Sequence, residues 1–157
     1  MTEPTTLDIS DPASADALAC LTAYFGEISA RFPGGFDPGP LDPVDLAAQR
    51  PPHGAFVIAR RGGAPVGCVA LRPDGDRMGE VKRLWVSQAA RKEGLATRLM
   101  IRIETEARAL GMTALRLDTS AHLPEAVAFY RRHGWVEIPR YNDNPYAHHW
   151  FTRSLGP

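Results

Sequence analysis

The chain has 157 residues, the size of one ordinary domain, so we expect a single domain over residues 1–157 with one hydrophobic core. Eighteen basic and eighteen acidic residues leave a formal net charge of zero, so charge favours neither a nucleic acid nor an anionic membrane as partner. The sequence has no apolar stretch of roughly 20 residues and no basic amino-terminal leader. We therefore expect a cytoplasmic protein without nucleic-acid or membrane partners. Cys20 and Cys68 lie in apolar segments and are expected to be buried free thiols.

The first third of the chain predicts two helices separated by a loop. Asp11 and Pro12 have the pattern of a helix cap and a first helical position, and apolar residues then recur at helical spacing, so we expect a helix over 12–31. Residues 33–54 carry six of the fourteen prolines, which indicates an ordered surface loop with one short helix beginning at Asp42.

The rest of the chain predicts a sheet with helices between its later strands. AFVIAR, APVGCVAL and EVKRLWV are runs rich in β-branched, aliphatic and aromatic residues, separated by glycine-containing turns, and they indicate an antiparallel meander. We then expect an amphipathic helix over 95–110, a strand over 114–119, a helix from Pro124 to about Arg132, and closing strands WVEI and HHWFTRSL. This order predicts an α+β fold with a central mixed, mostly antiparallel sheet flanked by helices.

The turn RKEGLA, residues 91–96, joins the third strand of the meander to the long helix and has the features of an anion site. The first backbone N–H groups of a helix have no intrahelical acceptor and lie at the positive end of the helix dipole. Gly94 and Ala96 carry no bulky side chain, so a phosphate could approach these amides, while Arg91 and Lys92 add positive charge. The turn therefore predicts pyrophosphate binding, although the same residues taken alone also fit a basic helix end in solvent.

Two motifs follow one another along this part of the chain. The first is V-x-x-x-x-R-x-x-G-x-A between a strand and the long helix, and the second is A-x-x-F-Y-x-x-x-G-W in the later helix. Together they resemble the GNAT superfamily of acyl-CoA-dependent N-acetyltransferases. The matching residues are Val86, Arg91, Gly94, Ala96, Ala126, Phe129, Tyr130, Gly134 and Trp135. The resemblance covers residues 55–138 closely, and it implies a GNAT-like fold and acetyl-CoA as cosubstrate, without a metal.

The resemblance also implies where coenzyme A binds. In the family, the amides of the turn bind the pyrophosphate of coenzyme A, and the pantetheine arm lies against the strand before the turn. Leu84 and Val86 would then offer main-chain hydrogen bonds to that arm. The residues of this chain expected to bind the cofactor in the turn are Arg91, Lys92, Gly94, Ala96 and Thr97.

Acetyl transfer to an amine needs a way to remove the proton of the amine. A lysine-like amine is almost entirely protonated at pH 7, so we expect a general base or a desolvating pocket. Glu80 opens EVKRLWV, where some family members carry a glutamate base; the alternative is a strand-edge carboxylate paired with Arg83 or Lys82. Asp118, at the end of the next strand, is a second candidate for the base or for binding a substrate ammonium, with loop capping as the alternative.

Tyr130 is the candidate proton donor, because the resemblance places its hydroxyl at the sulfur of coenzyme A. A phenol with a pKa near 10 is protonated at neutral pH and can donate to a thiolate whose reference pKa is about 8.5. An aromatic residue at this helical spacing also fits a core role. The chain departs from many relatives at Leu123, where they have an asparagine that binds the coenzyme arm, and neither Ser120 nor His122 is a strong replacement.

The loop between the last two strands is polar and aromatic, and the resemblance places it beside the acceptor. Asp143 is expected to pair with a substrate ammonium while Tyr141 and Tyr146 enclose it; the alternative is a hairpin turn fixed by Asp-Asn-Pro. The adjacent His148 and His149 would point to opposite faces of a strand, so we expect no metal site there.

These features together predict an N-acetyltransferase that moves an acetyl group from acetyl-CoA to a primary amine of a small molecule, by direct attack in a ternary complex. Neither motif holds a well-placed nucleophilic cysteine, and the aromatic loops at 33–41 and 139–147 could close over a small acceptor. Two alternatives remain open: an acetyltransferase of protein lysines or N-termini, and a non-catalytic acyl-CoA sensor. Terminal strands and the apolar HHWF segment are also compatible with a homodimer.

Overall fold

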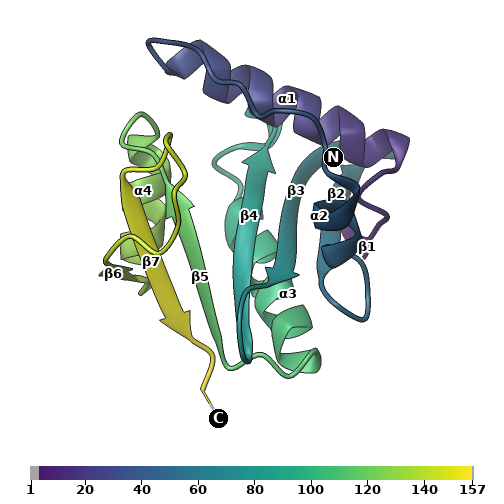
Figure 1. Ribbon diagram of the computed structural model, residues 1–157. Helices are drawn as coiled ribbons and strands as arrows, with labels where there is room; N and C mark the ends of the chain where they lie inside the picture. Colours follow the sequence, from purple (N-terminus) through teal and green to yellow (C-terminus); the bar gives the residue numbers. More distant parts are fainter. Residues whose placement is uncertain (1–3, 157) are drawn as a thin grey trace.

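The computed structural model describes residues 4–156 and shows one mixed sheet flanked by helices (Figure 1), which confirms the predicted α+β class. The strands follow one another across the sheet in the order β1-β2-β3-β4-β5-β7-β6. The strands are β1 (Thr5–Ile9), β2 (Ala55–Arg61), β3 (Ala64–Pro73), β4 (Met78–Val86), β5 (Ala114–Thr119), β6 (Val136–Ile138) and β7 (His149–Ser154). The helices are α1 (Ala15–Arg31), α2 (Pro43–Ala48), the short 3₁₀ helix η1 (Gln88–Ala90), α3 (Leu95–Ala109) and α4 (Pro124–Arg132).

The start of the chain differs from its prediction in two ways. Helix α1 begins three residues later than expected, because Ser14 is its cap and accepts a hydrogen bond from the Ala17 amide. Asp11 instead closes the preceding turn by accepting from the Ala13 amide at 2.8 Å. Strand β1, absent from the prediction, pairs antiparallel with β2 at the edge of the sheet. Its five residues are all partly or fully exposed, so they carry no strong apolar signal.

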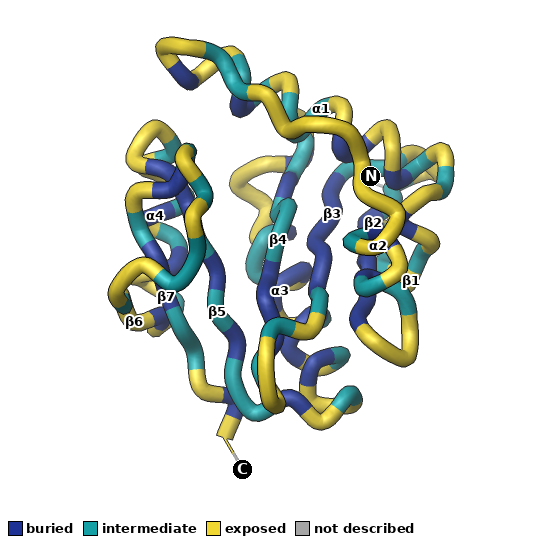
Figure 2. Tube along the Cα trace, viewed as in Figure 1, coloured by how far each residue is buried: buried dark blue, intermediate teal, exposed yellow. Residues whose placement is uncertain are grey.

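Helices cover both faces of the sheet (Figures 1 and 2). Alternate residues of a strand point to opposite faces, and in β2 Val57 belongs to a core shared with α3 and α4, while Phe56 and Ile58 belong to a second core beneath α1. The predicted buried thiols, Cys20 and Cys68, are both free and lie in this second core. Within residues 4–156, no helix combines the length and apolar character needed to cross a membrane.

Strands β4 and β5 are parallel neighbours that stay together over three residue pairs only, the last of which joins Glu80 to Arg116. Beyond that pair, β4 contains a bulge: its register against β3 shifts between Lys82 and Trp85, and Arg83 has a left-handed φ of 61°. A bulge bends its strand and increases the local twist. The strands therefore diverge after Glu80, and the edges of β4 and β5 that face each other remain without strand partners.

Gly54 fixes how the loop after α2 enters the sheet, and it gives a testable prediction for the fold. A Cβ atom at Gly54 would lie 2.2 Å from the Leu71 carbonyl oxygen and 2.3 Å from that of Ala48. Since backbone cannot move aside cheaply, we expect Gly54→Ala to lower the free energy of unfolding by about 3 kcal/mol in urea titrations. The control Gly26→Ala, in α1 with open space around it, should raise that energy by about 0.5 to 1 kcal/mol.

Candidate active site

A cavity of about 690 Å³ lies where β4 and β5 diverge. Its floor includes Glu80 and Leu84 from β4, and its other side includes Asp118 from β5 and Tyr130 from α4. The carboxyl-terminal half of α1 and the loop before α2 complete the wall, with Phe25 among their residues. The fold therefore brings the predicted base candidates and the predicted proton donor to one cavity, although they are far apart in the sequence.

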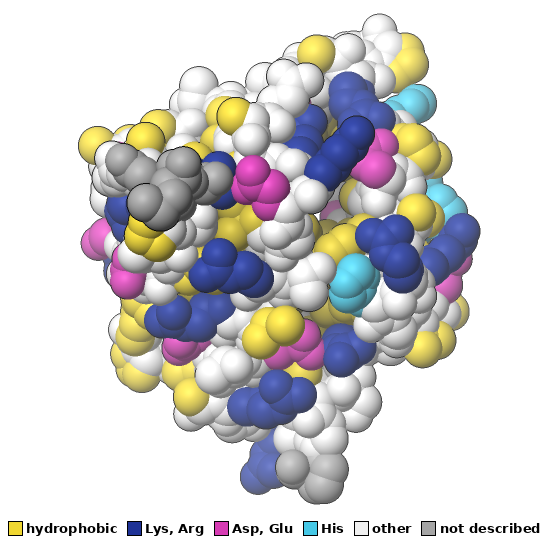
Figure 3. All heavy atoms as spheres, turned by 180° about the vertical axis from the view of Figure 1, so that it is seen from behind, with side chains coloured by type: hydrophobic (Ala, Val, Ile, Leu, Met, Phe, Trp, Pro, Cys, Tyr) yellow, Lys and Arg dark blue, Asp and Glu magenta, His cyan; other side chains and the backbone are white. Residues whose placement is uncertain are grey.

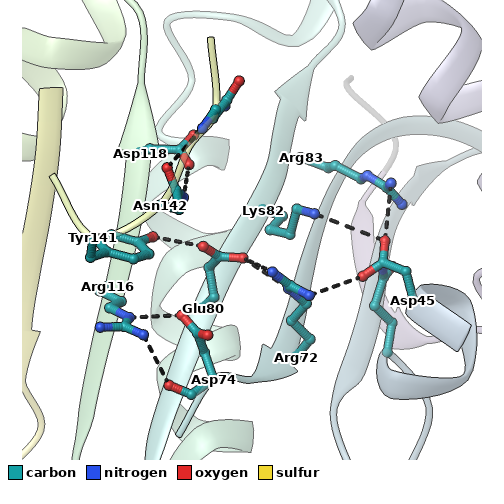
Figure 4. A network of polar contacts seen from close by, with 12 residues as sticks. Asp45, Arg72, Asp74, Glu80, Lys82, Arg83, Arg116, Asp118, Tyr141 and Asn142 are labelled. Carbon is teal, nitrogen blue, oxygen red and sulfur yellow. Dashed lines mark hydrogen bonds and ion pairs between the residues drawn. The ribbon is translucent and has the colours of Figure 1, made fainter. Parts of the chain in front are cut away.

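Glu80 is buried, with 4% of its side chain exposed, and it is the centre of a polar network (Figure 4). Two nitrogens of Arg72, in β3, contact its Oε1 at 2.7 and 2.8 Å, and the hydroxyl of Tyr141 donates to its Oε2 at 2.7 Å. The proposed pairing with Arg83 or Lys82 at a strand edge was wrong, because Glu80 lies inside the sheet and pairs with Arg72. Burial, followed by the charge of Glu80, raises the pKa of Tyr141, so its hydroxyl stays a donor.

Both carboxylate oxygens of Glu80 have partners, but Oε1 has more contacts than Oε2. A carboxylate has about four lone-pair positions, and Oε1 accepts both bonds from Arg72 whereas Oε2 accepts one bond from Tyr141. Oε2 can accept one more hydrogen bond, from a substrate ammonium or a water.

Asp118 anchors the loop between β6 and β7. Its two oxygens accept from the side-chain amides of Asn142 at 2.6 Å and Asn144 at 3.1 Å, so it fastens the loop as in the structural alternative. Asn142 in turn accepts from the indole of Trp150 at 3.0 Å. Both partners of Asp118 are neutral amides, so neither of them supplies a positive charge to the carboxylate beside the cavity.

The same loop meets the loop before α2 over the cavity. The rings of Phe36 and Tyr146 lie 4.5 Å apart, and the Tyr146 hydroxyl accepts from the Asp37 amide at 3.2 Å. Tyr146 lines the cavity, whereas Tyr141 reaches it only through Glu80 and Asp143 is exposed outside its lining.

Tyr130 belongs to the hydrophobic core and also lines the cavity. The ring packs against Trp135 and Phe151, with centroids 5.8 and 6.0 Å away. Burial raises the pKa of Tyr130 well above its ordinary value, with smaller contributions from Tyr24 and Asp118. The hydroxyl of Tyr130 therefore stays protonated at neutral pH and can act as a hydrogen-bond or proton donor. Leu123, at the position of the missing asparagine, also lines the cavity.

The turn before α3 lies beyond the far end of β4. Gly94 caps α3 with a φ of 77° and makes no side-chain capping bond, so the first amides of the helix are not capped. No atom within 4 Å would meet a Cβ at Gly94, so its left-handed backbone, and not crowding within the chain, requires glycine. Ala96, the second helical residue, keeps this end of the helix small.

Arg91 and Thr97, two polar side chains of the turn, already have partners inside the protein. Arg91 donates to the Val86 carbonyl at 3.1 Å and pairs with Glu27 of α1 at 2.5 Å. Thr97 lies 3.1 Å from Nε2 of His133, whose Nδ1 is 2.8 Å from the Phe129 carbonyl. Since Nδ1 must donate to that carbonyl, Nε2 of the neutral ring accepts from Thr97. Lys92 is exposed, with a φ of 65°.

The comparison with protein-family models decides the family. Residues 21–135 match the model of the Acetyltransferase (GNAT) family. The chain belongs to the GNAT family. This confirms the resemblance carried by the two sequence motifs.

Two proteins with similar sequences are also named as acetyltransferases. An IAA acetyltransferase of Azospirillum brasilense is 41% identical over 95 residues, which are 60% of this chain and 62% of the relative. An uncharacterized N-acetyltransferase of Schizosaccharomyces pombe is 36% identical over 97 residues, 60% of each chain. The match thus spans about three fifths of the length of these two relatives.

Solved structures share the GNAT fold. An acetyltransferase from Streptococcus agalactiae superposes with a TM-score of 0.77 at 20% identity, covering 96% of this chain and 98% of the other. The N-acetylglutamate synthase of Neisseria gonorrhoeae, complexed with coenzyme A and N-acetyl-glutamate, gives a TM-score of 0.73 at 19% identity, covering 97% and 36%. At these identities the likeness shows the fold.

Several residues of this candidate site were not predicted from the sequence, namely Arg72, Asp45, Asn142 and Asn144. Each acts by contacting a residue from another element, and no local motif marks such a contact. The part of the chain described by the structure contains no group of three or more His, Cys, Asp or Glu side chains placed to hold a metal ion.

The anchoring role of Asp118 can be tested by hydrogen exchange. Asp118 accepts hydrogen bonds on both of its oxygens, whereas an asparagine has one acceptor oxygen and would place its own NH2 group against an NH2 group of Asn142 or Asn144. Asp118→Asn should therefore weaken the two bonds that hold the loop. We expect the amides of Asn144 and Tyr146 to exchange about tenfold faster or more. Asp76→Asn, at an exposed aspartate, is the matched control. Equal exchange in both variants would contradict the anchor.

Proposed function

We propose that this protein is an acetyl-CoA-dependent N-acetyltransferase that acts on the primary amine of a small molecule. The observation that carries the proposal is that one cavity is lined both by Glu80, a buried carboxylate held by Arg72 and Tyr141, and by Tyr130. The family membership supports acyl-CoA as the donor, since GNAT acetyltransferases use acetyl-CoA and amine acceptors. The activities for which two similar proteins are named, IAA acetyltransferase and N-acetylglutamate synthase, are further support.

Coenzyme A is proposed to lie along the unpaired edge of β4 and to end at the turn before α3. Backbone amides of residues 95–97 are the proposed ligands of the pyrophosphate, because a helix start without a side-chain cap offers donors to an anion. Lys92, which is exposed, would add charge, whereas Arg91 holds the turn to Val86 and Glu27. Main-chain groups of Leu84 and Val86 are the proposed contacts of the pantetheine arm.

The proposed reaction is a direct transfer. The amine gives up its proton to Glu80, directly or through a water, and its lone pair then attacks the thioester carbonyl carbon. As the new C–N bond forms, the C–S bond breaks and the sulfur leaves with its electron pair. Tyr130 donates the proton that converts this thiolate to the thiol, and the second proton that the nitrogen loses on becoming an amide replaces it on Tyr130. Asp118 is the second candidate for the base, and its contacts with two amides favour a role in holding the loop or an ammonium.

A small acceptor is favoured over a protein by the contact across the cavity between Phe36 and Tyr146. An acetyl-transfer assay separates the alternatives. Thiol release from acetyl-CoA is measured with amino acids, polyamines and aminoglycosides, and with peptides that carry a free lysine or N-terminus. The proposal expects release with a small amine. Release with peptides alone would identify a protein acetyltransferase, and coenzyme A binding without any release would identify a sensor.

Substitution Tyr130→Phe tests the proton donor. The variant keeps the ring that packs on Trp135 and Phe151 and loses only the hydroxyl. We expect kcat to fall about 10²- to 10⁴-fold, with coenzyme A affinity and thermal stability unchanged. Because the pKa of Tyr130 is raised, the wild-type rate should not fall through loss of this proton below about pH 10. A variant as fast as the wild type would remove Tyr130 from the mechanism.

A further inference from the structure

Lys82 and Arg83, adjacent in β4, line the cavity and contact the same carboxylate oxygen (Figure 4). The Lys82 ammonium is 3.9 Å from Oδ2 of Asp45, and Nη2 of Arg83 is 3.3 Å from that oxygen. Successive residues of a regular strand point to opposite faces. The bulge, with its left-handed Arg83, is what brings two neighbouring cations to one anion.

The charges of this cluster do not balance. Arg72 is the third cation, and it divides its guanidinium between Glu80 at 2.7 Å and Oδ1 of Asp45 at 3.6 Å. Three cations therefore share two carboxylates, which leaves one positive charge in excess. The nearby Arg116 does not change this count, because Asp74 pairs with it at 2.7 Å.

The hydrogen-bond donors of the cluster are also incompletely used. Nη1 of Arg83 is buried and has no hydrogen-bond partner within residues 4–156. Lys82 is one-third exposed to the cavity side, and its ammonium is too far from Asp45 for a hydrogen bond. Burial lowers the pKa of Lys82, and the charges of Arg72 and Arg83 lower it further against the opposing effect of Asp45. An additional anion beside Lys82 would accept a hydrogen bond from its ammonium and would offset the excess positive charge.

An opposite charge lies on the strand across the cavity. Asp118 of β5 lines the cavity, and its two partners, Asn142 and Asn144, are neutral amides. The other lining carboxylate outside the Glu80 network, Asp37, is on the exposed loop before α2. The cavity thus has an unmatched negative group on β5 and an excess positive charge on β4.

We propose that the acceptor is a zwitterion, an amine that also carries a carboxylate. Lys82 binds the carboxylate of this acceptor, and the neighbouring Arg83 adds positive charge next to Lys82. Asp118 faces the ammonium of the acceptor before Glu80 takes a proton from that ammonium. One excess positive charge matches a carboxylate, whereas a phosphate monoester would bring nearly two negative charges. This inference rests on the proposed acetyl transfer and narrows its acceptor to amino-acid-like molecules.

Matched acceptors test the inference on the wild-type enzyme. The best amino acid found in the acetyl-transfer assay is compared with its own carboxamide and with its decarboxylated amine. We expect kcat/KM to be about 10- to 100-fold higher for the amino acid, the effect of one charge-assisted contact. The carboxamide is a stringent control, because its amine has the lower pKa and is more often neutral. The phosphonate analogue is a fourth arm, and it should be the poorer acceptor.

Substitutions of Lys82 test whether this residue causes the preference for the amino acid over its decarboxylated amine. In Lys82→Met the ratio of kcat/KM between the amino acid and its decarboxylated amine should fall close to one, while turnover of the decarboxylated amine persists. Lys82→Arg keeps the charge and should keep most of the preference. Arg77→Met is the control, because it also removes one positive charge, but Arg77 is exposed and outside this cavity.

A second measurement does not depend on a folded variant. The carboxylic acid that lacks the amine should inhibit the wild-type enzyme competitively against the acceptor, and its amide should not. Equal kcat/KM for the amino acid and the decarboxylated amine, or an unchanged ratio in Lys82→Met, would overturn the inference while leaving acetyl transfer intact. Failure of every amine to release thiol would instead overturn the proposed function.

Discussion

The divergence of β4 from β5 after Glu80 is the constraint on which the site depends. Parallel strands normally stay paired over their length, but here the bulge at Arg83 bends β4 away after the third residue pair. The left-handed conformation of a non-glycine residue costs about 1–2 kcal/mol, and the packing of α1 and α3 on the two faces of β4 holds it in place. One backbone irregularity therefore creates both the cavity and the unpaired strand edge that the proposed coenzyme would use.

The charged residues follow from that geometry. Glu80 belongs to the last residue pair before β4 and β5 separate. It is therefore buried within the sheet and still borders the cavity. Burial of a carboxylate is costly unless it is paired, and Arg72 and Tyr141 supply the partners. In Figure 3, the face seen from behind carries basic side chains spread over much of its area, with fewer acidic side chains among them. The polarity of the cavity is a local property of a chain with zero formal net charge.

Much of the fold was predictable because its signals are local. The amphipathic spacing of α3, the glycine at its start and the order F-Y-x-x-x-G-W all lie within short stretches of sequence. The contacts that define the site are not local: Glu80 meets Tyr141 across 61 residues, and Arg91 meets Glu27 across 64. The bulge at Arg83 was not predictable either, because arginine has no preference for a left-handed backbone and only the pairing with β3 reveals the extra residue. Sequence reasoning thus named Glu80 and Tyr130 as candidates, and the structure places both at one cavity and shows which side chains hold Glu80.

The most direct measurement is amide hydrogen exchange of the whole chain with and without coenzyme A. If the diverging edge of β4 and the start of α3 form the coenzyme site, then exchange should slow on binding at residues 81–86 and 95–97. The edge strand β1, remote from the cavity, should exchange at the same rate in both states. Protection at neither segment, with coenzyme A bound, would contradict the account and place the coenzyme elsewhere on the protein.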